Sequence, residues 1–265
     1  MAREKISVCI TACDEEKNIR RCLESVKWAD EIIVVDSFSR DRTLDICREY
    51  TARIFQRPWL GYIGQKNLIK DLAIGPWILF VDADEEVSSE LKAEILHEFE
   101  SSANAGYDGY DFPRMVYYMG QWIRHGEWYP DIKMRLFRKH RGICGGREPH
   151  DRTTVPGPVK RLTGHLYHYT YEDLTDQIKT LNEFSTISAQ SAGDDLPFRW
   201  VDLLLRPPLR FFKAYIIKRG FLDGSRGWIV ASAAAFGVFL KYAKMLEARF
   251  TASAAPKAAA ASGDR

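Results

Sequence analysis

The sequence lacks several features that would assign it to a large class of proteins. It has five cysteines, an odd number with no Cys-x-x-Cys pair, so neither a zinc site nor a redox dithiol is expected. Scattered cysteines of this kind favour a reducing, cytosolic compartment. The N-terminus has neither the long apolar run nor the small-residue cleavage site of a signal peptide, so we do not expect secretion.

Long hydrophobic runs are also missing. The longest uncharged stretch, 227–240, has 14 residues, whereas a membrane-spanning helix needs about 18 to 20. A full membrane crossing is therefore not expected. Charge of one sign is not in excess either, because 38 lysines and arginines face 36 acids. The net charge of +2 argues against a nucleic-acid-binding protein.

The sequence does have enough apolar material for a core, since 46% of its 265 residues are hydrophobic. That length suits one large domain, or one domain with an appendage. In the N-terminal part, β-rich runs alternate with helical ones, which predicts an α/β fold with a mostly parallel sheet and helices on both faces. The expected strands are 6–12, 31–36, 52–55 and 77–82, and the expected helices are 16–28, 42–50, 62–73 and 88–99, the last with Ser88 or Ser89 as N-cap.

Acidic residues follow three of the expected strands. Asp14 comes after the first, Asp36 ends the second, and four acids crowd the end of the fourth: Asp82, Asp84, Glu85 and Glu86. In parallel α/β sheets, ligands bind outside the carboxyl ends of the strands, where the strand order reverses. We therefore expect these three acidic patches to share one edge of the sheet.

The crowded acids repel one another, so they require compensation. For oxygen ligands a divalent cation, Mg²⁺ or Mn²⁺, supplies it, and Asp82 and Asp84 in the turn are candidates to hold such an ion against phosphate oxygens. Glu85 and Glu86 have a simpler explanation, because acids at or near the start of the next helix are favoured by its dipole. These two glutamates are expected to need no ligand.

The region 106–170 is aromatic, basic and interrupted by Gly and Pro, which is typical of short strands and loops lying over the site. Residues 171–190 return to helical spacing. Within the region, Trp128 and Tyr129 have two interpretations. They could stack on a sugar ring, or they could pack in an aromatic core.

The segment 197–250 differs in composition. It holds ten lysines and arginines against three acids, a charge of +7, with eleven aromatic residues interleaved. Basic helices with aromatic anchors are typical of attachment to an anionic membrane surface, but a helical hairpin packed on the catalytic domain or on a second subunit has the same composition. The expected division is 1–195 for the sheet domain, 196–250 for the basic helical segment and 251–265 for a low-complexity, disordered tail.

Several motifs, taken in order, carry a family resemblance. SVCITACDEEKNI, EIIVVDSFSRDRT, GQKN and WILFVDADEEVSSEL resemble glycosyltransferase family 2, the inverting sugar transferases of GT-A fold. Downstream, WYPDIKMRLFR, EPHDR, GHLYHYTY and GFLDGSRGW resemble its lipopolysaccharide core β-glucosyltransferase branch. The resemblance spans about residue 6 to about residue 247 and is more specific than any one motif. It implies a Rossmann-like GT-A domain followed by an amphipathic helical extension.

The resemblance assigns roles around the donor. The loop after the first strand lies along the nucleotide, Asp36 contacts the uracil, and Lys66 in GQKN lies near the diphosphate, where it would otherwise be a solvated helix lysine. Phe38 stands where the family pattern often has glycine, which leaves the rest of the base contact open. The implied nucleotide-sugar set is Thr11, Ala12, Glu15, Asp36, Gln65, Lys66 and Asp82, with Asn67 beside it.

The metal and the general base come from the same resemblance. Asp84 is the implied ligand of Mg²⁺ or Mn²⁺, and His168 can add a metal or phosphate contact, although a lone histidine between tyrosines is more often a packed strand residue. An inverting transfer needs a base for the acceptor hydroxyl and a cation for the leaving diphosphate. The implied base is Asp151, which follows His150. Glu148 competes with it, and either acid could instead pair with a neighbouring arginine.

The resemblance implies transfer of glucose from UDP-glucose, or a close relative, to a lipid-linked saccharide such as a lipopolysaccharide inner-core heptose. The enzyme would lie peripherally on the cytoplasmic face of the membrane, either alone or as a homo-oligomer. A polyprenyl phosphate is the alternative acceptor. Two other classes stay open: a phosphatase that uses the first Asp of Asp-x-Asp, with 193–195 as its late acidic motif, and a catalytically silent nucleotide-binding protein.

Overall fold

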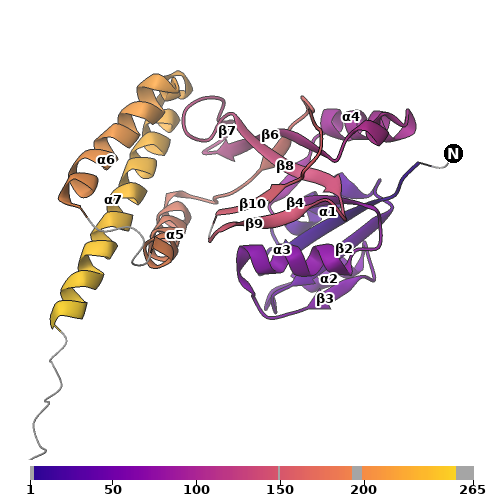
Figure 1. Cartoon of the computed structure of the whole chain (residues 1–265), viewed down its shortest axis with the longest axis horizontal. Helices are drawn as coiled ribbons and strands as arrows, with labels where there is room; N and C mark the ends of the chain where they lie inside the picture. The colour runs from indigo at the N-terminus through magenta and orange to yellow at the C-terminus, as the bar shows by residue number, and fades with distance from the viewer. Residues whose placement is uncertain (1–2, 149, 193–198, 255–265) are drawn as a thin grey trace, which may run out of the picture.

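The computed structural model describes residues 3–148, 150–192 and 199–254 (Figure 1). Its centre is a ten-stranded sheet in the order β3-β2-β1-β4-β8-β6-β12-β5, with β7 and β11 also paired to β6, and β9 and β10 form a separate two-stranded sheet. The strands are β1 Ile6–Ala12, β2 Glu31–Asp36, β3 Ile54–Gln56, β4 Trp77–Asp82, β5 Glu85–Val87, β6 Gly109–Tyr118, β7 Gln121–Trp122, β8 Asp131–Arg138, β9 Ile143–Arg147, β10 His150–Thr154, β11 Val159–Arg161 and β12 Leu166–His168.

The helices follow the predicted order, with shorter bounds at some ends. Ser88 is the N-cap of α4 and its hydroxyl accepts a hydrogen bond from the Leu91 amide, as the sequence predicted. The helices are α1 Ile19–Val26, α2 Thr43–Arg48, α3 Gly61–Leu72, α4 Ser89–Glu100, α5 Leu174–Ala192, α6 Trp200–Phe212 and α7 Gly224–Ala254, with single turns η1 Ala103–Gly106, η3 Lys213–Ile217 and η4 Gly220–Asp223.

The first half of the sheet, β3-β2-β1-β4, is parallel; β1, β2 and β4 are almost wholly buried, whereas the edge strand β3 is partly exposed. Side chains alternate between the faces along each strand. Val8 of β1 packs in the core cluster that includes residues of α1 and α4, whereas Cys9 packs in the cluster that includes Ile69 of α3. Two-sided burial explains why these strands read as continuous apolar runs. The α/β fold with helices on both faces is confirmed.

The second half of the sheet is mixed. β8 is antiparallel to β4 and β6, β12 is parallel to β6, and β5 is antiparallel to β12. Strand β5 holds Glu85 and Glu86, which we expected at or near the start of the next helix, and it pairs Glu85 with His168. Through this pairing, the residues that follow the turn after β4 form the last strand in the sheet order.

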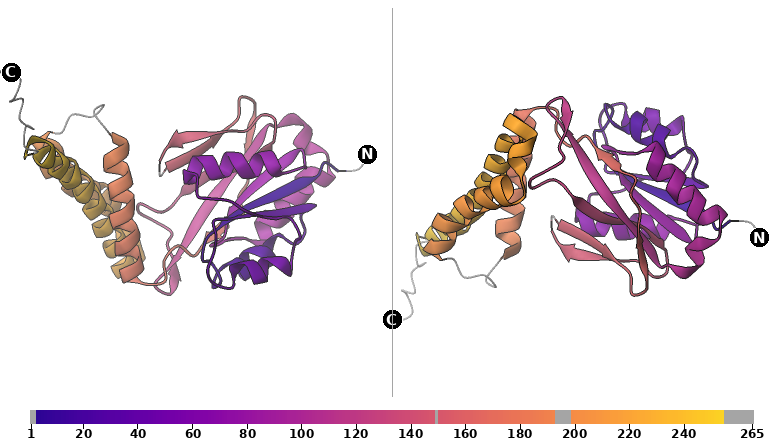
Figure 2. Two further views of the ribbon diagram at one scale, coloured as in Figure 1. Left: turned by 90° about the horizontal axis from the view of Figure 1, so that it is seen from below. Right: turned by 90° about the horizontal axis from the view of Figure 1, so that it is seen from above.

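The C-terminal helices α5, α6 and α7 lie together at the end of the molecule away from the N-terminus (Figures 1 and 2). A cavity of about 510 Å³ between α6 and α7 has apolar walls, and large apolar side chains on both helices are exposed. The exposed set includes Trp200, Leu204, Leu205, Leu209, Phe212, Trp228, Phe236 and Phe239.

Helix α7 changes two expectations about the C-terminus. Gly220–Thr251 is long and apolar enough to cross a membrane by length and composition, so the 14-residue limit that argued against a crossing is wrong. The helix continues past Lys241, which ends the uncharged run, and past Lys244. Core helices of soluble proteins pass the same test. α7 also reaches Ala254, beyond the boundary expected at 250, and the tail 255–265 lies outside the described residues.

Candidate active site

The carboxyl ends of β1, β2 and β4 meet at one edge of the sheet. In the strand register, Thr11 pairs with Asp82 of β4, and Ala12 pairs with Asp36 of β2. In the sheet, β2 and β4 lie on opposite sides of β1, so the strand order reverses at this point. The expected ligand edge of the sheet is therefore where the sequence motifs converge.

Asp82 is neutralised by two cations from other elements. Arg135 of β8 donates from Nη2 to its Oδ2 at 2.6 Å, and the Lys66 ammonium lies 3.7 Å from its Oδ1. Burial by itself raises the pKa of Asp82, but the charges of Arg135 and Lys66 outweigh burial and hold that pKa well below its usual range. The carboxylate is therefore kept ionised and fixed in orientation.

Glu85 does not lie at a helix start, and the expectation that it serves the helix dipole is wrong. It is fully buried in β5, where it accepts from the Asp82 amide at 2.9 Å and from Arg114 at 3.2 Å and Arg135 at 3.1 Å. A buried carboxylate is stable only when paired in this way. Glu86, the other acid assigned to the helix start, hydrogen-bonds the Tyr169 hydroxyl instead.

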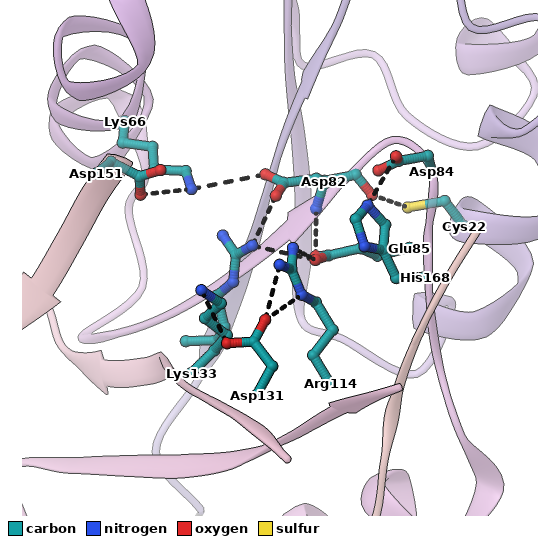
Figure 3. A network of polar contacts seen from close by, with 11 residues as sticks. Cys22, Lys66, Asp82, Asp84, Glu85, Arg114, Asp131, Lys133, Asp151 and His168 are labelled. Atoms are coloured by element: carbon teal, nitrogen blue, oxygen red, sulfur yellow. Dashed lines mark hydrogen bonds and ion pairs between the residues drawn. The ribbon is translucent and has the colours of Figure 1, made fainter. Parts of the chain in front are cut away.

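These contacts form one chain of alternating charges across the site (Figure 3). The chain continues from Arg114 to Asp131 at 2.8 Å and from Asp131 to Lys133 at 3.1 Å. Sequence reasoning missed Arg114 and Arg135. The signal for Arg135 was available in KMRLFR, where Lys133 and Arg135 lie on the same face of a strand, but nothing in that pattern identifies the acids that these cations would meet.

Asp84 and His168 lie side by side, with His168 Nε2 at 2.9 Å from Asp84 Oδ2. Burial raises the pKa of Asp84, yet the neighbouring His168 more than offsets it and lowers the pKa below its ordinary value. β12 brings His168 here through its pairing with β5. The structure thus joins the two residues that the sequence named as metal ligands.

The side chains present suit a metal ion whose coordination shell is completed by a bound ligand. Among the described residues, no group of three or more His, Cys, Asp or Glu side chains is placed to hold a metal ion. Asp84 and His168 supply two side chains, and the Nδ1 of His168 is buried without a hydrogen-bond partner. Mg²⁺ is commonly held by one or two carboxylates, with substrate phosphates and waters completing its shell.

Lys66 is almost fully buried, at 6% exposure, so it is not a solvated helix lysine. From α3 its ammonium donates to Asp151 Oδ2 at 2.8 Å while it also faces Asp82 (Figure 3). Beside it, Gln65 donates to the Ser37 hydroxyl at 2.9 Å, and its own Oε1 is buried without a partner. Asn67 instead donates to the backbone oxygens of Ile63 and Cys144, away from the acids.

The two candidate bases lie in the β9–β10 hairpin but have different surroundings. Asp151 faces the acids of the sheet edge through Lys66. Glu148 accepts from the Ile63 amide at 3.0 Å and so satisfies a free amide in the first turn of α3. Neither acid has the arginine partner that the sequence suggested within the described contacts.

Asp36 organises the loop after β2. It is fully buried and accepts hydrogen bonds from the Ser39 amide and hydroxyl and from Gln56. Phe38, which departs from the family's glycine, has a positive φ of 62° and is exposed. Glycine adopts this left-handed backbone without strain, which explains the family preference at this position. A base contact by Asp36 requires an exchange of these internal partners and stays a prediction.

Glu15, in the loop after β1, has an altered acidity. Burial, together with the negative charges of Asp84, Asp41 and Asp82, raises the pKa of Glu15 to about 7, against a lowering hydrogen bond from Asn18. A carboxyl group that changes charge near neutral pH therefore lies beside the acidic edge.

Trp128 and Tyr129, the two candidates for stacking on a sugar ring, lie in different surroundings. Trp128 packs edge-on against Tyr118, with ring centroids 5.1 Å apart, in a small core cluster. Tyr129 lines a cavity of about 330 Å³ together with Trp122 and His165. Tyr167 also lines this cavity, and alternation along β12 puts it on the sheet face opposite His168. The cavity is thus separated from the acids by the sheet.

Comparison with known proteins places the chain in a family. Residues 7–155 match the description Glycosyl transferase family 2. An uncharacterized glycosyltransferase of Rickettsia typhi is 31% identical over 257 residues, which are 92% of this chain and 87% of that protein. The lipopolysaccharide core biosynthesis glycosyltransferase LpsC of Rhizobium meliloti is 29% identical over 250 residues, 91% of this chain and 92% of that protein.

Among solved structures, S. aureus TarS 1–349 in complex with UDP-GlcNAc aligns with a TM-score of 0.47 and 16% identity, over 94% of this chain and 92% of that chain. The family match contains the Asp-x-Asp strand on which the phosphatase alternative depended, so that alternative is wrong; its late motif at 193–195 lies outside the described residues. With a match from residue 7 to residue 155 of 265 and relatives alike over nearly their whole length, the chain belongs to glycosyltransferase family 2.

Proposed function

We propose that this enzyme transfers a sugar, glucose by the sequence resemblance, from its UDP-sugar to a lipid-linked saccharide such as a lipopolysaccharide inner-core heptose. The observation that carries the proposal is the convergence of Asp151, Lys66 and Asp82 beside Asp84 at the carboxyl edge of the sheet. The Rhizobium meliloti relative, alike over nearly the whole of both chains, is named for lipopolysaccharide core biosynthesis, which supports this class of acceptor.

In the proposed reaction, Asp151 takes the proton of the acceptor hydroxyl as that oxygen attacks the anomeric carbon of the donor. The new carbon–oxygen bond forms while the bond from the anomeric carbon to the β-phosphate oxygen breaks, and the electron pair leaves with UDP. Attack opposite the leaving group inverts the anomeric centre. Glu148 is less suited to the role because its carboxylate is engaged by the first turn of α3.

Cations on this chain serve the diphosphate and the orientation of the donor. Lys66 supplies a buried positive charge for the phosphates, and Arg135 holds Asp82 toward the donor ribose or sugar. Asp84, with His168, is the proposed ligand set for Mg²⁺ or Mn²⁺. When bound there, the metal would neutralise charge on the departing diphosphate.

The remaining nucleotide contacts are proposed at the same edge. Thr11 and Ala12 end β1 and Glu15 follows it; these three residues would lie along the nucleotide, and Asp36 would face the uracil. Gln65 has a buried side-chain oxygen without a hydrogen-bond partner, which makes it available to a donor hydroxyl. These residues lie at the same edge of the sheet as Asp82 or, in the case of Gln65, on α3.

We also propose that α6 and α7 attach the enzyme peripherally to the cytoplasmic face of a membrane. Exposed leucines and aromatic residues on both helices, together with the charge of +7 over 197–250, suit an anionic lipid surface. Attachment would keep the catalytic edge near a lipid-linked acceptor. A homo-oligomer through the same apolar surface is the competing use of these helices.

The reaction is tested by UDP release from UDP-glucose and other UDP-sugars, with a heptose-terminated lipopolysaccharide or a polyprenyl phosphate as acceptor. Asp151→Asn is expected to lower kcat by about 10² to 10⁴, the range for loss of a general base. Glu148→Gln is the matched control and should stay within about tenfold of wild type, since it removes only a helix-end contact. Asp84→Ala and EDTA should each abolish release.

Full transfer by Asp151→Asn contradicts the assignment of the base. Transfer only to the polyprenyl phosphate contradicts the saccharide acceptor, and failure of every UDP-sugar to bind or react contradicts the proposed donor.

A further inference from the structure

Lys66 contacts the proposed base and the donor edge at once. Its ammonium donates to Asp151 Oδ2 at 2.8 Å and lies 3.7 Å from Asp82 Oδ1. Asp82 has a second cation, Arg135, at 2.6 Å. Within the described part of the chain, Lys66 is the one cation that forms an ion pair with Asp151.

The contact engages one of the two carboxylate oxygens of the proposed base. A general base must offer a free carboxylate oxygen to the acceptor hydroxyl, within hydrogen-bond reach. In the structure, Oδ2 of Asp151 already accepts a hydrogen bond from Lys66. An acceptor that arrives before the donor would therefore meet a base that has one of its two oxygens engaged by a buried ammonium group.

The donor brings the charge that can move Lys66. A nucleotide diphosphate carries more negative charge than one carboxylate, and lysine is a compact charge on a flexible stem that can turn between nearby anions. Loss of Lys66 does not leave Asp82 without a cation, because Arg135 keeps its own contact with Asp82. The exchange therefore disturbs a single ion pair.

We propose that Lys66 exchanges Asp151 for the diphosphate when the donor binds, so that donor binding itself frees the base. The hydrogen bond from Lys66 Nζ to Asp151 Oδ2 breaks, one from Nζ to a phosphate oxygen forms, and no proton is transferred. Asp151 stays a carboxylate and becomes available to the acceptor hydroxyl. This inference rests on the proposed function, because it requires the site to bind a nucleotide diphosphate.

A rigid role for Lys66 predicts the opposite coupling. If Lys66 stays on Asp151 and serves only to position it, Asp151 and the diphosphate do not compete for the ammonium. Removal of the Asp151 charge then leaves the affinity for the donor unchanged or lowers it. If the two anions compete for Lys66, removal of the Asp151 charge strengthens donor binding. The sign of the effect therefore separates the two roles.

The test is a double-mutant cycle on the full chain, with UDP binding measured by titration calorimetry in the presence of MgCl₂. Asp151→Asn is expected to tighten UDP binding by roughly three- to tenfold, the size of a partly buried ion-pair contact. In a Lys66→Met background, the same Asp151→Asn change should alter UDP affinity by less than about twofold. Acceptor and catalysis play no part in this readout.

Asp131→Asn is the matched control. It removes the same charge from the same network, but Asp131 contacts Arg114 and Lys133 rather than Lys66. Any general gain from lost negative charge appears equally in this control and persists without Lys66. Asp151→Ser is the second variant if Asp151→Asn does not fold, as judged by its thermal unfolding midpoint.

The outcomes are distinguishable. UDP binding by wild type with no tightening in Asp151→Asn, or with equal tightening in Asp131→Asn, overturns the exchange and leaves the proposed function intact. No UDP binding by folded wild type overturns the proposed function and the exchange together.

Discussion

At the scale of single residues, environment divides one run of acids into different roles. Glu85 is fully buried and paired with Arg114 and Arg135, so it acts as a structural counter-charge. Asp82 shares Arg135 with Glu85 but lies at the strand end beside Lys66. The Asp84 carboxylate instead contacts His168. Burial and the identity of the neighbouring cation, rather than position in the run, decide what each carboxylate can do.

Glu15 gives a prediction about pH and stability. Its pKa is about 7 in the folded protein, because burial and nearby acids disfavour its charge, and about 4.5 in a free chain. Between these values the folded state binds more protons than the unfolded state, so this group lowers stability as the pH rises from about 4.5 to 7. Glu15→Gln should therefore be more stable than wild type by about 1–3 kcal/mol at pH 8, and equal to it near pH 4.5.

Urea unfolding without nucleotide or metal, at pH 5 and pH 8, measures this difference. The exposed Glu100 provides the control, since Glu100→Gln should follow wild type at both pH values. A stability difference that does not grow with pH would contradict the role assigned to burial of Glu15.

At the scale of elements, the site is assembled where β8, α3 and the β9–β10 hairpin meet the parallel strands. β8 pairs with β4 and places Arg135 against Asp82, and α3 places Lys66 between the sheet edge and the hairpin. The carboxyl edge was predictable from strand order and Asp-x-Asp spacing. The antiparallel partner of β4 was not, because a short alternating strand carries no information about which distant strand it will join.

Arg135 gives the prediction at this scale. Arg135→Met keeps the bulk of the side chain but leaves Asp82 and Glu85 without a shared cation in a buried site. Removing one partner of a buried ion pair costs about 3–5 kcal/mol, so a loss of this order in the free energy of unfolding is expected. Lys133→Met is the control, because Lys133 is 37% exposed and pairs only with Asp131; its cost should stay below about 1 kcal/mol.

Urea denaturation followed by circular dichroism gives both values from the same experiment. Equal losses in the free energy of unfolding for the two variants would contradict the stabilising role assigned to Arg135.

At the scale of the whole molecule, the catalytic sheet and the C-terminal helices lie at opposite ends of the chain's long dimension (Figure 1). Helices α6 and α7 pack on each other, yet both expose large apolar side chains. Such an apolar surface marks an interaction site rather than a solvated face. The Arg210 contact with Glu127 and the Arg226 contact with Met119 tie these helices to the sheet domain.

Flotation with lipid vesicles tests the membrane role. The full chain should float with vesicles containing anionic phosphatidylglycerol and much less with neutral phosphatidylcholine, and high salt should weaken binding. Leu205→Glu with Leu209→Glu, one turn apart and both exposed on α6, should reduce the bound fraction about tenfold or more. Ile74→Glu is the matched control, because Ile74 is more exposed than either leucine but lies on the sheet domain.

Flotation of the double variant at the level of wild type would contradict membrane attachment through α6. If the double variant instead changes the sedimentation coefficient of the protein in the absence of lipid, the apolar surface serves an oligomer.

The alternation of strands and helices, the parallel half of the sheet and the gathering of Asp36, Asp82 and Asp84 at one edge were predictable from the sequence. These follow from local periodicity and from the order of elements along the chain. The burial of Glu85 in a strand, the pairing of Asp82 with Arg135 and the contact of Lys66 with Asp151, 85 residues away, became visible in the folded molecule. Such contacts depend on how distant elements pair and pack, and the local pattern of a sequence does not contain that information.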